Sequence, residues 1–134
     1  MIFMDPRHRR HFDDLLEQVL EELPHMVHEL IERVPLHVED YPSREVLRET
    51  GIRRRDELCG LYTGIPLTER SVSQSGNLPD VVTIYREGIL AAARGTGGRI
   101  SIAELRRQIR ITILHELAHH HGLDEDELRQ LGYG

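Results

Sequence analysis

The spacing of hydrophobic positions changes several times along the 134-residue chain. From Phe12 to Val34 apolar residues recur every three or four positions, and Pro24 interrupts the stripe, which predicts a pair of helices. The middle of the chain holds short runs that predict strands at residues 36–39, 61–64 and 81–85. The clearest of these is 81–85, which is β-branched at its centre. Residues 44–50 and 89–94 are expected to form short helices.

The longest predicted element is the last helix. Ser101 and Glu104 have the spacing of a capping box, S-x-x-E, which sets the start of this helix near Ile102. The helix should continue to His121, because Gly122 can end it in a left-handed cap. Helices at both ends with strands between them predict an α+β fold, in a single domain of residues 1–134. Residues 1–11 are polar and charged for the most part, and they are expected to be flexible or frayed.

Composition narrows the classes of function. The net charge of −6 argues against binding through bulk electrostatics, so no nucleic-acid partner is expected. All 17 basic residues are arginine, which excludes Schiff-base chemistry and a lysine-dependent P-loop. The single cysteine, Cys59, cannot form an internal disulfide and is interpreted as a small buried apolar residue. Neither a transmembrane span nor a secretory signal is visible, so a cytoplasmic protein without a membrane partner is expected.

Candidate chemistry lies near the end of the last helix, where residues 115–119 read H-E-x-x-H. Residues i and i+4 of a helix lie on one face, so His115 and His119 can direct their imidazoles at one ion. Glu116 is rotated about 100° from His115 and can flank the ion without binding it. This is the position of a general base for a metal-bound water. The pattern predicts a catalytic zinc site with one Zn²⁺ per chain.

A histidine-rich, solvent-exposed helix end is the simpler explanation of this motif. Three features favour a metal site instead: an apolar helix leads into the motif, a glycine follows it, and acidic residues come shortly after. Gly122 lets the chain double back, which would bring Asp124 and Glu125 toward the ion. A carboxylate as third ligand leaves a fourth position open for water. His120 and His121 point away from the metal-binding face by helical geometry, and structural roles are expected for them.

The motif resembles the metzincin signature H-E-x-x-H-x-x-G-x-x-H/D, with Glu125 at the position of the third ligand. More closely, the chain is similar to the zincin-like metallopeptidase family of small bacterial proteins, the minimal zincins. The pattern LYTGIPLTERS at residues 61–71 and LPD at 78–80 also match this family, and the similarity extends from about Phe12 onward. The third-ligand position usually carries His or Asp in the family. This chain has Glu125 with Asp124 beside it, so which acid binds the metal is open.

The resemblance implies a small mixed sheet of three to four strands packed on an N-terminal helical pair and a C-terminal active-site helix. It also implies a zinc peptidase that acts on a peptide or protein substrate, with Glu116 as general base. Tyr62, Arg70 and Tyr85 lie in segments that match the family and are candidate contacts to the substrate or transition state. For each of them, core packing or a structural salt bridge is at least as good an explanation. As a separate hypothesis, residues 81–85 form an exposed edge strand that aligns an extended peptide.

Three functions are open at this point. A zinc metallopeptidase is favoured by Glu116. A metal-dependent endoribonuclease of the kind that matures bacterial ribosomal RNA spaces its ligands similarly, H-x₃-H-x₅-H, but Glu116, Glu125 and the acidic net charge count against it. A non-catalytic module, in which the metal only stabilises the C-terminal turn while the protein binds a partner, is compatible with the small size of the chain. The natural substrate and the oligomeric state are not determined by the sequence.

Overall fold

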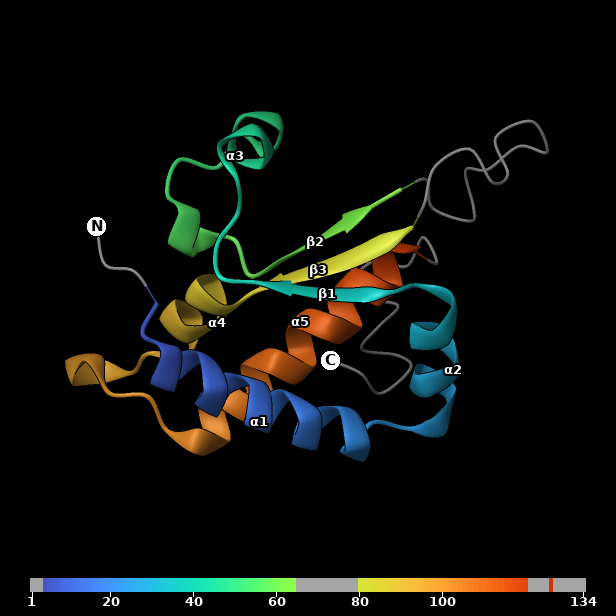
Figure 1. Cartoon of the computed structure of the whole chain (residues 1–134), viewed down its shortest axis with the longest axis horizontal. Coiled ribbons are helices and arrows are strands. Elements are labelled where there is room, and N and C mark those ends of the chain that lie inside the picture. The colour runs from blue at the N-terminus through green and yellow to red at the C-terminus, as the bar shows by residue number, and fades with distance from the viewer. Residues whose placement is uncertain (1–3, 65–79, 121–125, 127–134) are drawn as a thin grey trace.

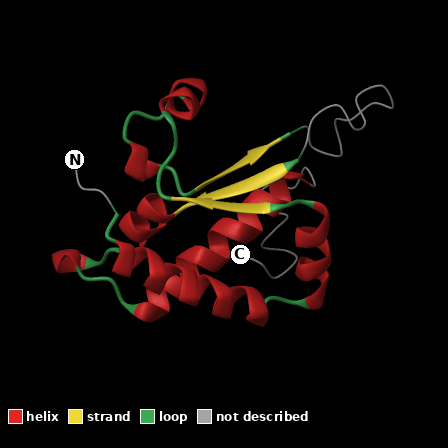
Figure 2. Ribbon diagram, in the orientation of Figure 1, coloured by secondary structure: helices red, strands yellow, loops and turns green. Residues whose placement is uncertain are grey.

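A small sheet with helices packed against it forms the computed structural model, which describes residues 4–64, 80–120 and 126 (Figure 1). Helices and strands are distributed through the chain, as Figure 2 shows, which confirms the α+β class. In chain order the elements are α1 (Pro6–Glu22), α2 (His25–Arg33), β1 (Leu36–Glu39), α3 (Arg44–Thr50), η1 (Arg55–Glu57), β2 (Gly60–Thr63), β3 (Val81–Tyr85), α4 (Arg86–Ala93), η4 (Thr96–Gly98) and α5 (Ile102–His120).

The sheet of the described residues is mixed and has the strand order β1-β3-β2. Strand β1 runs parallel to β3, with Leu36 opposite Val82, and β2 runs antiparallel to β3, with Tyr62 opposite Val82. Strand β3 is therefore central and hydrogen-bonded on both sides. The hypothesis that residues 81–85 form an exposed edge strand is wrong, because β1 and β2 occupy both of its edges.

The core lies where α5 is enclosed between the sheet and α1 (Figure 1). Side chains of successive β-strand residues point to opposite faces, and Val82 and Ile84 of β3 are both fully buried in this core. Helix α5 is buried on more than one face, since it contacts strands and α1 together. Its buried apolar residues are Leu105, Ile109, Ile113, Leu114, Leu117 and Ala118. In the described part of the chain, no helix has the length and apolar composition to cross a membrane.

Helix α1 begins earlier than the apolar stripe predicts. Asp5 is its N-cap and accepts a hydrogen bond from the backbone N–H of Arg7 at 2.8 Å, and Pro6 occupies the first helical position. Arg9 then bonds to Asp40, with 3.1 Å between Nε and Oδ1. The prediction that residues 1–11 are frayed is therefore wrong from Pro6 onward, because a cap and an ion pair hold this turn.

Helix α5 places the candidate site, and its start is the one expected. The Oγ atom of Ser101 accepts a hydrogen bond from the backbone N–H of Glu104 at 3.1 Å, which fixes the first turn. The helix extends to His120, so the H-E-x-x-H motif occupies its last two turns. The predicted helix end at His121 and Gly122 lies outside the described residues.

Candidate metal centre

The last two turns of α5 bring His115, Glu116 and His119 together. His115 is half-buried, and the side chain of His119 is 57% exposed, so the imidazole of His119 is accessible from solvent. The side chain of Glu116 is only 13% exposed. Its Oε1 lies 3.1 Å from Nδ1 of His119. The helix therefore presents two imidazoles, one of them exposed, beside a largely buried carboxyl group.

Gly60 allows strand β2 to lie directly against this carboxyl group. A Cβ atom at Gly60 would lie 2.8 Å from Cγ2 of Thr112, 3.0 Å from Cγ of Glu116 and 3.2 Å from the carbonyl oxygen of Thr83. A side chain at this position would therefore force the strand and the helix apart. The sequence gives no signal of this contact, because Gly60 and Glu116 meet only through the packing of β2 on α5.

The environment of Glu116 makes it a better proton acceptor than an exposed glutamate. Burial raises the pKa of Glu116, against the opposing effects of the charge and hydrogen bond of His119, a backbone hydrogen bond from Tyr62, and the charge of His115. A carboxyl group with a raised pKa is better matched to general-base catalysis near neutral pH. Burial, and after it the charge of Glu116, also raises the pKa of the Cys59 thiol. Cys59 is therefore held neutral, as expected for a residue that packs against the core.

The three candidate substrate contacts lie in different environments. The Oη atom of Tyr62 donates a hydrogen bond to Oδ1 of Asp80 at 2.8 Å. Tyr85 is 2% exposed, and burial, with a contribution from the charge of Glu39, raises its pKa. Tyr85 therefore lies in the core, where its ring contributes to packing. Arg70 lies outside the described residues.

The structure does not describe either candidate for the third metal ligand. Asp124 and Glu125, the two acids predicted for this role, both lie outside the described residues. Within residues 4–64, 80–120 and 126, no group of three His, Cys, Asp or Glu side chains could hold a metal ion. The described part of the chain therefore supplies two imidazole donors, His115 and His119, and a neighbouring base.

The comparison with known families agrees with this arrangement. Residues 31–134 match the model of the family described as zincin-like metallopeptidase. The chain belongs to this family. The match includes every strand of the sheet and the whole of α5, and α1 precedes it. No match was found among curated proteins. Membership confirms the resemblance noted in the sequence, and it implies zinc binding and a hydrolase-type activity for the family as a whole.

The donors of this zincin-like metallopeptidase fit a zinc ion. Zinc is bound in proteins by imidazole nitrogens, and His115 and His119 provide two of them from successive turns of one helix. The Nδ1 atom of His119 faces Glu116, which leaves Nε2 of the same ring as the nitrogen that can bind a metal. A partner at the second ring nitrogen is the usual way in which a metal-binding histidine is oriented.

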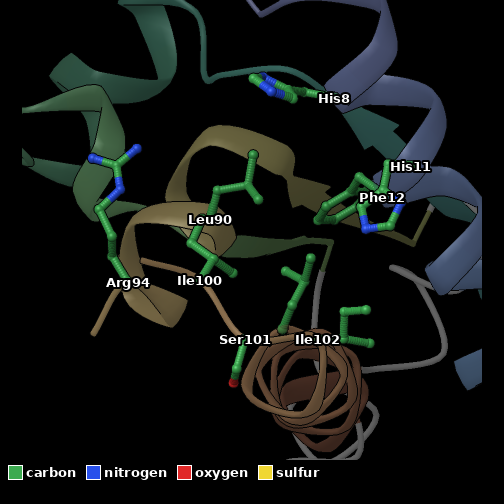
Figure 3. A pocket seen from close by; sticks show the side chains of 9 residues that line it. His8, His11, Phe12, Leu90, Arg94, Ile100, Ser101 and Ile102 are labelled. Carbon is green, nitrogen blue, oxygen red and sulfur yellow. The ribbon is translucent and has the colours of Figure 1, made fainter. Parts of the chain in front are cut away.

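A separate cavity lies near the opposite end of α5 (Figure 3). It has a volume of about 270 Å³ and is lined by Phe12, Leu90, Arg94, Ile102 and neighbouring side chains. At 1.5 Å per helical residue, Ile102 and His119 are about 25 Å apart along α5. The cavity is therefore not part of the metal centre.

Proposed function

We propose that this zincin-like metallopeptidase hydrolyses peptide bonds with Zn²⁺ and that Glu116 is the general base. The observation that carries the proposal is the buried carboxyl group of Glu116, which lies 3.1 Å from His119 at its junction with strand β2. Burial and a raised pKa are typical of a catalytic base, whereas a histidine-rich surface helix requires neither.

In this proposal each residue of the motif has one task. His115 and His119 hold the zinc ion, with Glu125 or Asp124 as the third ligand. When bound, Zn²⁺ would act as a Lewis acid and lower the pKa of a coordinated water. The carboxylate of Glu116 takes up the proton of the attacking water and then delivers it to the leaving amine. The hydrogen bonds from His119 and the backbone of Tyr62 hold this carboxylate in place.

The outer edge of β2 is proposed as the surface that aligns an extended peptide. The carbonyl oxygen of Cys59 accepts a hydrogen bond from the backbone N–H of Tyr85 at 2.8 Å, so Cys59, Leu61 and Thr63 direct their backbone groups toward β3. By the alternation of an antiparallel pair, the backbone groups of Gly60 and Tyr62 face the other edge.

This edge is beside the proposed base. One group on it, the backbone N–H of Tyr62, already bonds to Glu116. Among the described strands β2 has β3 as its one neighbour. A peptide added to this edge would run past the metal centre. Strand β2 therefore replaces β3 as the proposed docking strand.

The decisive experiment compares two single-atom changes on the same helix. Zinc-loaded protein and its Glu116→Gln and Glu104→Gln variants are assayed against a peptide library, and zinc affinity is measured by chelator competition. Glu104 is the matched control because it lies in the first turn of α5, where it pairs with Arg107. We expect Glu116→Gln to reduce peptide hydrolysis by about 100-fold or more while zinc binding persists, since it removes the base but no ligand.

Three outcomes would contradict the proposal. Wild-type hydrolysis in the Glu116→Gln variant would remove this residue as the base. Zinc binding by a wild-type protein that cleaves no peptide would favour the non-catalytic binding module. Cleavage of structured RNA in the same assay, without peptide cleavage, would favour the endoribonuclease.

A further inference from the structure

A buried histidine next to the metal centre has no task in the mechanism above. His120 follows His119 directly, and the rotation of about 100° per helical residue turns it from the solvent side toward the sheet. The side chain of His120 is 8% exposed, compared with 57% for His119. A buried imidazole at the end of a helix needs polar partners, and the sheet supplies them.

Two residues from the ends of strands surround His120. The Oη atom of Tyr62 donates to Oδ1 of Asp80 at 2.8 Å. The Nδ1 atom of His120 lies 3.4 Å from Oη of Tyr62 and 3.7 Å from Oδ2 of Asp80. The rings of Tyr62 and His120 meet edge to face, with 5.6 Å between their centroids and an interplanar angle of 70°. We refer to these three residues as the Tyr62–Asp80–His120 network.

The network connects three elements that are distant in sequence. Tyr62 lies on β2, Asp80 directly precedes β3, and His120 is the last described residue of α5. Figure 1 shows the end of β2 and the start of β3 beside the final turns of α5. The side chain of Asp80 is only 13% exposed, so the polar contacts of the network are largely shielded from water.

Gly64 lies directly against the network, at a position that has no room for a side chain. A Cβ atom there would collide with the Asp80 carboxylate and would lie 2.9 Å from Oη of Tyr62. The φ angle of Gly64 is +140°, a value that residues with side chains rarely adopt. The backbone at Gly64 is therefore packed against the Tyr62–Asp80 hydrogen bond.

We propose that the Tyr62–Asp80–His120 network positions the last turn of α5 so that His119 stays in register with His115. The proposal rests on the proposed zinc site, and Tyr62, Asp80 and His120 are positioning residues that act through His119. The last turn of a helix has unpaired carbonyl groups and frays unless other contacts hold it. Because His119 lies in that turn, fraying would move one of the two imidazoles.

The network also assigns a role to the hydroxyl group of Tyr62. This hydroxyl is engaged with Asp80 and lies near His120, so its function here is to orient the helix end. The role differs from the oxyanion contact expected for Tyr62 from its family pattern. Preorganised ligands bind a metal more tightly than mobile ones, because less ordering is required on binding.

Zinc affinity tests the proposal without any peptide substrate. The variants Tyr62→Phe and Asp80→Asn are compared with the wild type and with Tyr41→Phe in a chelator competition. Tyr41→Phe is the control because Tyr41 stacks under Arg55, with 3.9 Å between the ring centroid and Cζ, and is not part of the network. We expect Tyr62→Phe and Asp80→Asn each to weaken zinc binding about tenfold, while Tyr41→Phe retains wild-type affinity.

A double-mutant cycle and the metal-free protein give the second readout. If the residues act as a unit, the Tyr62→Phe/Asp80→Asn double variant should lose little more affinity than either single variant. In the absence of zinc, the amides of residues 117–120 should exchange with solvent faster in these variants, whereas those of residues 105–113 should not change. A uniform change along α5 would indicate a general loss of stability and would overturn the proposal.

Failure of this inference and failure of the proposed function give different results. Wild-type zinc affinity and amide exchange in both variants would overturn the network even if the protein cleaves peptides. Conversely, the wild-type protein could bind zinc but cleave no peptide, which would contradict the proposed function. Weaker zinc binding by the two variants would then still support the positioning role of the network. Tyr62→Phe removes one oxygen atom and keeps the ring, so it is the variant most certain to fold if Asp80→Asn does not.

Discussion

At the scale of single residues, Gly60 determines how closely strand β2 can approach the proposed base. Gly60 lies in the contact between β2 and α5, where a Cβ atom would approach both Thr112 and Glu116 within 3.0 Å. Both neighbours are held by their own bonds: Thr112 donates from Oγ1 to the carbonyl oxygen of Gln108 at 2.8 Å, and Glu116 contacts His119. Neither side chain can move away without breaking one of these contacts.

Replacing Gly60 with alanine should therefore destabilise the protein and disturb its base. We expect Gly60→Ala to lower the free energy of unfolding by about 1–3 kcal/mol, the usual cost of overpacking, and to reduce hydrolysis by displacing Glu116. Urea denaturation and the peptide assay measure the two effects. Gly95→Ala is the control, since a Cβ there meets its nearest atom, the carbonyl oxygen of Arg99, at an ordinary 3.5 Å. Equal stability of both variants would refute the steric role of Gly60.

The sequence predicts the positions of the motif residues but not their surroundings. The spacing of His115, Glu116 and His119 determines their arrangement on a helix, because it depends only on the helical repeat. The burial of Glu116 depends on Gly60, and the contact of His120 depends on Asp80. Both contacts join residues far apart in the chain, so no local pattern reports them.

At the scale of secondary-structure elements, Asp40 joins two helices to the end of β1. Its Oδ1 atom accepts hydrogen bonds from Nε of Arg9 on α1 at 3.1 Å and from Nη1 of Arg86 on α4 at 2.8 Å. Arg86 also bonds to Asp13 of α1, with 2.9 Å between Nε and Oδ1. This group of charges fixes the N-terminal half of α1 against the start of α4.

The stability that Asp40 contributes should be lost in acid. The hydrogen bond from Arg9 holds the pKa of Asp40 below its usual range, against the effect of burial and with the help of Arg86. A carboxyl group with a lowered folded-state pKa contributes stability that is present above its unfolded pKa and lost as pH falls through the folded value. Asp40→Asn should therefore cost about 1 kcal/mol at pH 7, and the difference from the wild type should shrink below about pH 4.

Urea denaturation between pH 3 and pH 7 measures this difference. Asp56→Asn is a suitable control, because its partner Arg54 has a side chain that is 72% exposed, and such pairs contribute little. A difference between the wild type and Asp40→Asn that stays constant over this range would show that the charge of Asp40 does not stabilise the fold.

Element boundaries were predicted well where local signals act alone. The strands at residues 36–39 and 81–85 and the helix at 44–50 match β1, β3 and α3 to the residue. Alternation indicates the first strand, β-branched residues indicate the second, and the helix lies between caps at Ser43 and Gly51. The start of α1 was wrong because the apolar stripe begins at Phe12, whereas the cap at Asp5 and Pro6 sets the boundary. Strand order could not be predicted, since the pairing of β1 with β3 depends on the packing of the whole sheet.

At the scale of the whole molecule, zinc binding should stabilise the fold. A ligand that binds only the native state adds stability according to its concentration relative to its Kd, about 2.7 kcal/mol at 100 times Kd. Thermal denaturation with zinc and with a chelator should therefore give different midpoints for the wild type. The His115→Ala/His119→Ala variant should show no such difference, because it lacks both imidazole donors. A zinc-dependent shift of equal size in this variant would place the binding site elsewhere.

The pairing of Leu36 with Val82 also bears on the order in which the protein can assemble. During translation β1 emerges from the ribosome well before β3. The parallel pairing of these two strands can therefore form only after β3 has been synthesised. Helix α5, which carries the H-E-x-x-H motif, comes after both. A nascent chain that ends before His115 thus lacks the proposed base and all its proposed zinc ligands, and the proposed hydrolytic centre can be completed only after translation has passed Asp124 or Glu125.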